Sequence, residues 1–119
     1  KEGSEKMISK TEMIKFKIDG KTLEILLLGE IDHHNAVKLR SQADELIKKH
    51  SPKKVVLNLS HIEFMDSSGL GLIMGRFALI KKYGGTLALL DPSPAVMKMI
   101  KLAGMDRMVT ILKTKVKGI

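Results

Sequence analysis

A carboxylate and two hydroxyls lie side by side at Asp66-Ser67-Ser68-Gly69, between a strand-like run and a helix-like run. Side chains at the start of a helix lie next to unpaired backbone N–H groups and the positive end of the helix dipole. Such a position can bind an anion or carry an added phosphoryl group. This stretch is therefore the candidate functional site of the chain.

A phosphoryl group on either serine would add about −1.5 to −2 charges beside Asp66. The helix dipole tolerates that charge and the carboxylate repels it, so we expect the modification to change what the surface binds more than it changes the fold. Gly69 and Gly71 leave the backbone bare near the serines, which would let a partner approach closely. One alternative stays open here: the glycines only let the helix pack on the sheet, and the serines only follow a cap residue.

Other uses of the same stretch can be tested by residue spacing. Gly69 and Gly71 begin a dinucleotide-binding GxGxxG pattern, but Met74 stands where the third Gly is required. The stretch contains no GK[ST] phosphate loop. Met65 stands where a nucleophile elbow centred on Ser67 needs a Gly. These patterns do not support a nucleotide-binding or hydrolase motif.

Metal and acid–base chemistry also lack a suitable pattern. The histidines, at positions 33, 34, 50 and 61, show no HExxH-like spacing, and the chain has no Cys. Asp32 and Asp66 could form a carboxylate pair, because both should follow strands that end at the same edge of a parallel sheet. Each is explained more simply as a helix N-cap, a role that typically contributes about 1 kcal/mol. We therefore favour capping over catalysis for both residues.

Length and composition fit one soluble globular domain, with 119 residues, 44% hydrophobic and 29% charged. No apolar run approaches the roughly 20 residues that span a membrane, and a chain without Cys fits a cytoplasmic location. The net charge of +8 would suit a nucleic-acid partner, but the lysines are scattered. With one Tyr, three Phe and no Trp for base stacking, we do not expect nucleic-acid binding.

Strand and helix patterns alternate along the chain and predict an α/β fold with a mixed, mostly parallel sheet. Strands are expected at 13–18, 23–28, 54–59, 86–90 and 108–112. Asp19-Gly20 predicts an antiparallel hairpin between the first two strands. The apolar run at 25–28 predicts burial on both faces of the sheet.

Three helices are expected between these strands. They run from the Asp32 cap to about His50, from about Ser67 to Tyr83, and from Ser93-Pro94 to Gly104. The second helix should bury an apolar stripe of Leu70, Ile73, Phe77 and Ile80. Residues 1–10 are expected to be a disordered arm or a tag remnant, and residues 11–119 a single domain.

Three motifs make the chain resemble a known family. FMDSSGLGLIMGR at 64–76, GEIDHH at 29–34 and SPAV at 93–96 closely resemble the anti-sigma-factor antagonists of the STAS domain family. The similarity is strongest to the sporulation-type antagonists of the sigma-F system and covers about residues 13–112. It implies a single STAS-like domain that acts as a partner-switching regulator, with no enzyme activity and no cofactor of its own.

The resemblance also implies partners and a switch. Unphosphorylated antagonists of this family bind an anti-sigma factor that is also a serine kinase, and so release the sigma factor. The kinase uses ATP to phosphorylate the Ser after the Asp of the motif, here Ser67, and a metal-dependent PP2C-type phosphatase reverses this. The resemblance places the following residues on the kinase-binding face: Asp32, His33, Asp66, Ser68, Gly69 and Leu70.

Two departures from the family pattern accompany the match. Many members finish with a further helix, which is expected to be absent or truncated here, and the chain is more basic than the family leads us to expect. The motifs leave open a STAS module of another partner-switching or stress-signalling system. They also leave open a nucleotide-binding STAS domain that uses Asp32, Asp66 and Ser67.

Overall fold

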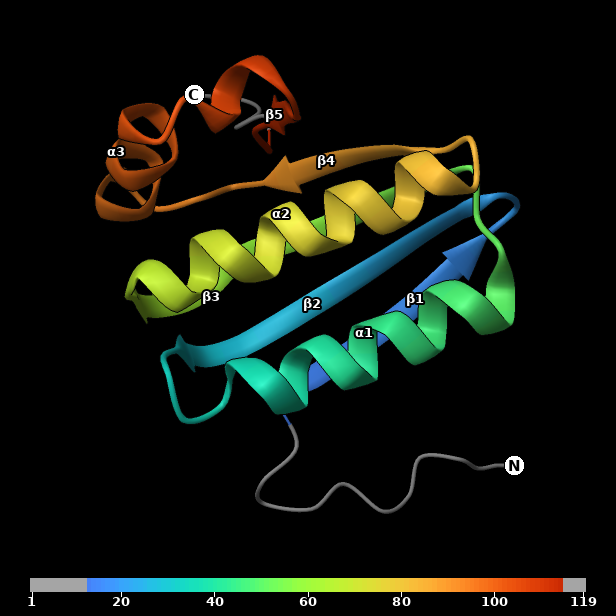
Figure 1. Ribbon diagram of the computed structural model, residues 1–119, viewed down its shortest axis with the longest axis horizontal. Coiled ribbons are helices and arrows are strands. Elements are labelled where there is room, and N and C mark those ends of the chain that lie inside the picture. Colours follow the sequence, from blue (N-terminus) through green and yellow to red (C-terminus); the bar gives the residue numbers. More distant parts are fainter. Residues whose placement is uncertain (1–12, 115–119) are drawn as a thin grey trace, which may run out of the picture.

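The computed structural model describes residues 13–114, which form a five-stranded sheet with three α-helices and a 3-10 helix (Figure 1). The strands are β1 (Ile14–Asp19), β2 (Thr22–Ile31), β3 (Lys54–Met65), β4 (Thr86–Leu90) and β5 (Thr110–Leu112). The helices are α1 (Ala36–His50), α2 (Ser67–Lys82), α3 (Pro94–Leu102) and the 3-10 helix η2 (Met105–Arg107). The arm predicted at residues 1–10 lies outside the described residues.

The strands lie in the sheet in the order in which they occur along the chain. β1 and β2 are antiparallel and are joined through Gly20, whose φ of +64° suits a residue without a Cβ. The other neighbouring pairs are parallel. The predicted α/β class, with its mostly parallel sheet and antiparallel hairpin, is confirmed. Because β2 to β5 run in one direction, their carboxyl ends lie at the same edge of the sheet.

β2 buries one face fully and the other only in part. Leu23, Ile25 and Leu27 are at most 1% exposed and belong to the same core as the inner residues of α1, whereas Leu26 and Leu28 are partly exposed. Figure 1 shows the reason, since α1 and α2 lie side by side over the same face of the sheet. The predicted burial of run 25–28 on both faces is therefore wrong.

β3 continues six residues beyond its predicted end at 59 and carries the chain to the candidate site. The extension pairs with the last residues of β2, and the register is irregular between Leu26 and Leu28 and again between Gly29 and Glu30. β4 pairs only with residues 54–58, so β2 and β3 extend together past β4. Sequence patterns missed the extension because most of its side chains are exposed, and only Ile62 and Met65 are buried.

α2 buries a different stripe from the predicted one. Ile73 and Ile80 are buried as expected, but Leu70 and Phe77 are partly exposed, and Leu72 and Arg76 are buried instead. This helix carries apolar residues on most of its circumference, so the apolar pattern could not identify the face that packs.

Arg76 is buried because it has a partner on the neighbouring helix. Its Nε lies 2.7 Å from Oδ1 of Asp44 in α1, its Nη2 donates to Oδ2 at 3.4 Å, and its Nη1 donates to the Leu72 carbonyl at 3.3 Å. Burial lowers the pKa of Arg76, and the Asp44 carboxylate acts in the opposite direction. The pair joins α1 to α2, and no pattern in the sequence predicted it.

The last helix and strand follow the prediction less closely. Ser93 caps α3 as expected, since its Oγ accepts from the Val96 N–H at 3.2 Å. The final strand is shorter than predicted, 110–112 instead of 108–112, because the N–H groups of Met108 and Val109 bind the Met105 carbonyl at the end of η2. Neither element contributes a residue to the candidate site.

Candidate functional site

Asp66 occupies the single position between β3 and α2. Its backbone is extended, and its Oδ1 accepts from the N–H of Ser68 at 2.8 Å, which confirms the predicted N-cap. The Ser68 N–H lowers the pKa of the Asp66 carboxyl below its ordinary value. Asp66 is therefore an anionic cap beside the two serine hydroxyls.

The same carboxylate also holds the chain that follows β2. Its Oδ2 accepts from the backbone N–H of His33 at 3.3 Å, and the Asp66 N–H donates to the Ile31 carbonyl at 3.0 Å. The His33 N–H further lowers the pKa of Asp66. Because both carboxylate oxygens bind backbone N–H groups, this Asp is a poor candidate for a general base. It instead joins the ends of two parallel strands.

Asp32 forms a turn and does not cap α1, which corrects the prediction. Its Oδ1 accepts from the N–H groups of His34 at 2.9 Å and Asn35 at 3.0 Å. The Asn35 Oδ1 accepts in return from the Asp32 N–H at 2.9 Å. Asn35 is the residue before the helix, and α1 begins at Ala36. Asp and Asn side chains often stabilise such turns by binding nearby N–H groups, and here that interaction delays the helix.

The structure brings all the predicted site residues to the edge of the sheet where β2 and β3 end. Ser67 is exposed and Ser68 is partly buried. His33 is exposed, while Asp32 and Leu70 are partly exposed. Of the two hydroxyl-bearing residues, Ser67 is thus the more accessible to another protein.

The two glycines that follow have different environments. Gly69 is buried, and a Cβ built on it would lie 2.2 Å from Cγ of the buried Met65. Gly71 is exposed, and a Cβ there would meet nothing within 4 Å. The two roles that the sequence left open therefore apply to different residues. Gly69 lets α2 pack closely on β3, and Gly71 leaves bare backbone at the surface.

A groove of about 210 Å³ lies between the first turns of α1 and α2. It is lined by Ala36, Val37, Arg40, Ser68, Gly71 and Leu72. Neither Val37 nor Arg40 was expected at the site from the sequence. The sequence offered one signal for Val37, because it is an apolar residue outside the apolar stripe of its helix. In the structure the Val37 residue is 59% exposed.

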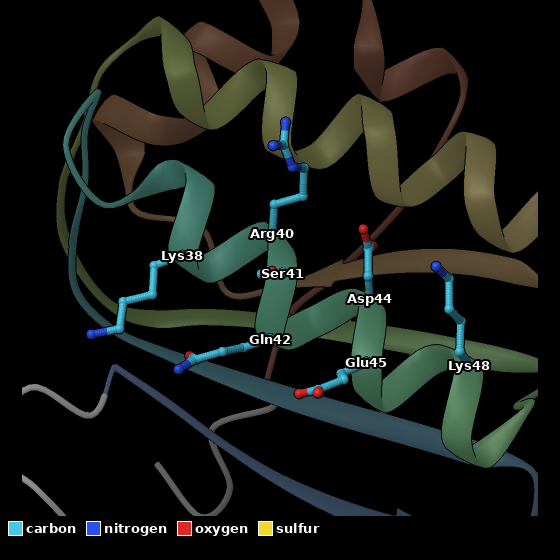
Figure 2. A pocket seen from close by; sticks show the side chains of 7 residues that line it. All are labelled: Lys38, Arg40, Ser41, Gln42, Asp44, Glu45 and Lys48. Atoms are coloured by element: carbon cyan, nitrogen blue, oxygen red, sulfur yellow. The ribbon is translucent and has the colours of Figure 1, made fainter.

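A second hollow, of about 400 Å³, runs along α1. Its lining comes from one helix and mixes charges of both signs: Lys38, Arg40, Ser41, Gln42, Asp44, Glu45 and Lys48 (Figure 2). Figure 2 shows that Arg40 and Asp44 point toward α2, whereas Lys38, Gln42 and Glu45 point away from it. Polar groups that converge on one ligand are expected of a binding pocket, and this hollow lacks them.

Within residues 13–114, no group of three or more His, Cys, Asp or Glu side chains is placed to hold a metal ion. No helix in the same part of the chain is long and apolar enough to cross a membrane.

Comparison with known proteins identifies the family. The STAS domain family matches residues 13–117. The chain is 38% identical over 97 residues to the anti-sigma F factor antagonist of Paenibacillus polymyxa. The aligned region covers 82% of this chain and 83% of the relative. The chain belongs to the STAS domain family, as the sequence motifs predicted.

Solved structures agree with this placement. The anti-sigma factor antagonist SpoIIAA in its unphosphorylated form is similar with a TM-score of 0.74 and 29% identity, over 86% of this chain and 88% of that chain. The phosphorylated form of the Bacillus cell fate determinant SpoIIAA is similar with a TM-score of 0.69 and 28% identity, over 86% and 91% of the two chains.

Proposed function

We propose that this protein is an anti-sigma-factor antagonist controlled by phosphorylation of Ser67. In its unphosphorylated form it binds an anti-sigma factor that is also a serine kinase, and this binding frees the sigma factor. The kinase transfers phosphate from ATP to the Ser67 hydroxyl, and a PP2C-type phosphatase removes it. Because the exchange uses ATP and a sigma factor, we place it in the cytoplasm.

The observation that carries this proposal is the exposed Ser67 beside a fixed carboxylate. Ser67 is the first residue of α2, and Asp66 is held next to it by the N–H groups of Ser68 and His33. The helix dipole would tolerate a phosphate at this position, so the fold should persist. The surface, in contrast, would gain a strongly hydrated dianion next to an existing negative charge.

This change in charge is large enough to act as a switch. A repulsion and desolvation cost of about 3 kcal/mol in the contact surface would weaken binding more than a hundredfold. We propose that the contact surface contains Asp32, His33, Asp66, Ser68, Gly69 and Leu70. In this surface Gly69 would act through its backbone, because it is buried against Met65 and sets the distance between α2 and β3.

The phosphorylation site can be tested by incubating the protein with ATP and its cognate anti-sigma factor kinase. We expect one phosphate per chain, and mass spectrometry of proteolytic fragments should assign it to Ser67. The Ser67→Ala variant should accept no phosphate, while the Ser68→Ala variant should still accept one phosphate, on Ser67. Phosphate on Ser68 alone, or no phosphate at all, would contradict the proposal.

A further inference from the structure

Arg40 carries a positive charge that has no carboxylate partner among residues 13–114. The side chain points from α1 toward α2, as does Asp44 one turn later (Figure 2). Asp44 is already paired with the buried Arg76 at 2.7 Å. The Arg40 charge lies close enough to Arg76 to contribute to the lowering of its pKa, after the larger effect of burial. Arg40 therefore gives the groove between α1 and α2 a positively charged rim.

The rest of the groove is mostly apolar and open. Val37 is 59% exposed on one wall, and the bare backbone of Gly71 forms part of the other. Leu72, which is 5% exposed, also lines it. The volume of about 210 Å³ is below the range of about 300–1,000 Å³ that is typical of small-molecule pockets. It suits a single side chain of a protein partner.

We propose that this groove accepts an apolar side chain of the anti-sigma factor kinase, and that a carboxylate of the same kinase segment pairs with Arg40. The proposal rests on the proposed function and extends it to a second contact. Ser68 lines the groove and immediately follows Ser67, so a partner that covers the Ser67 hydroxyl also reaches the groove. A cationic rim selects a carboxylate, since opposite charges across an interface favour the correct partner and orientation.

Charge reversal at Arg40 tests the ionic contact. Arg40→Glu should weaken kinase binding about tenfold or more, because a like-charge contact would replace an attractive one. Lys49→Glu is the matched control, since it makes the same change about 14 Å further along α1 and also on an exposed residue. Equal affinities of the two variants in calorimetry would overturn the proposal.

Filling the groove tests the apolar contact. Gly71→Leu should weaken kinase binding about tenfold, because the new leucine side chain would fill the groove that the partner's side chain enters. Gly75→Leu is the control one turn along α2, where a Cβ likewise meets nothing within 4 Å and the residue does not line the groove. Thermal unfolding establishes that each variant is folded. A folded Gly71→Leu variant that binds like the wild type would overturn this contact, and if the variant does not fold, the Arg40 comparison decides.

The two proposals fail in different ways. A wild-type chain that neither binds the kinase nor accepts phosphate on Ser67 contradicts the proposed function and the groove with it. A wild-type chain that binds and is phosphorylated, while Arg40→Glu and Lys49→Glu bind equally well, contradicts the groove alone. The salt dependence of kinase binding is an independent test. Added salt should weaken binding of the wild type more than binding of Arg40→Gln, because salt screens the ionic contact that the variant lacks.

Discussion

The backbone N–H of His33 donates to Oδ2 of Asp66 across 33 positions of sequence, at 3.3 Å. This bond joins the turn after β2 to Asp66, the residue immediately before α2. The other oxygen of the same carboxylate caps α2 through Ser68. Two segments of the proposed contact surface are therefore held by one side chain, which lies next to the proposed phosphorylation site.

Removal of the Asp66 carboxylate should therefore affect both stability and binding. We expect Asp66→Ala to lower the thermal unfolding midpoint and to weaken kinase binding, because α2 loses its cap and His33 loses its acceptor. Ser93→Ala is the matched control, since it removes an equivalent cap from α3 at a typical cost of about 1 kcal/mol and should leave kinase affinity unchanged. Equal kinase affinities for both variants would contradict this role of Asp66.

The stabilising effect of Asp66 should depend on pH. The folded protein holds the pKa of this carboxyl below its ordinary value, chiefly through the Ser68 N–H. The carboxylate therefore stabilises the fold above its unfolded pKa of about 3.9, and the contribution is lost as the pH falls through the folded pKa. Urea unfolding should show a stability gap between wild type and Asp66→Asn at pH 7 that shrinks below about pH 4. A stability difference that stays constant with pH would show that the Asp66 charge does not stabilise the fold.

Gly69 and Gly71 should respond in opposite directions to the same substitution. Gly69→Ala places a methyl group against Met65 and should cost about 1–3 kcal/mol, as overpacking of a core does. Gly71→Ala points into open space and should stabilise α2 by up to about 1 kcal/mol, since Ala is the better helix former. Chemical denaturation measures both. Destabilisation by Gly71→Ala would contradict the placement of Gly71 at an open surface.

Loss of Asp44 should lower the free energy of unfolding more than loss of Arg76. Asp44→Ala leaves a cation that is 6% exposed without its partner and should cost about 2–4 kcal/mol. Arg76→Met leaves a carboxylate that is 26% exposed and fills the space with an apolar chain, so it should cost less than about 1.5 kcal/mol. The double variant should be more stable than Asp44→Ala alone. Equal costs for the two single variants would contradict this description.

The fold was predictable because its local signals agree with one another. Asp19-Gly20 marked the hairpin, the β-branched start of β3 marked a central strand, and Ser93-Pro94 marked a helix start. The signals failed where long-range contacts decide the local structure. The mutual bonds of Asp32 and Asn35 shift the start of α1, and the partner of Arg76 lies 32 positions away in the chain.

The candidate site was only partly predictable, for a similar reason. Asp66-Ser67-Ser68-Gly69 is contiguous, so its residue types could be read directly as a capped helix start. Its link to His33 depends on the pairing of β2 with β3, and the groove beside Arg40 depends on how α1 packs against α2. No local pattern specifies either contact. The preference for Ser67 came from the family resemblance, and the greater exposure of Ser67 is consistent with it.

The affinity of the kinase for the two forms of the protein tests the central claim most directly. Calorimetry in the presence of ADP should compare the unphosphorylated protein with protein phosphorylated at Ser67. We expect binding to weaken more than a hundredfold on phosphorylation, in keeping with a loss of about 3 kcal/mol. Ser67→Ala should bind like the unphosphorylated form. Equal affinity of the kinase for the phosphorylated and unphosphorylated proteins would contradict the account.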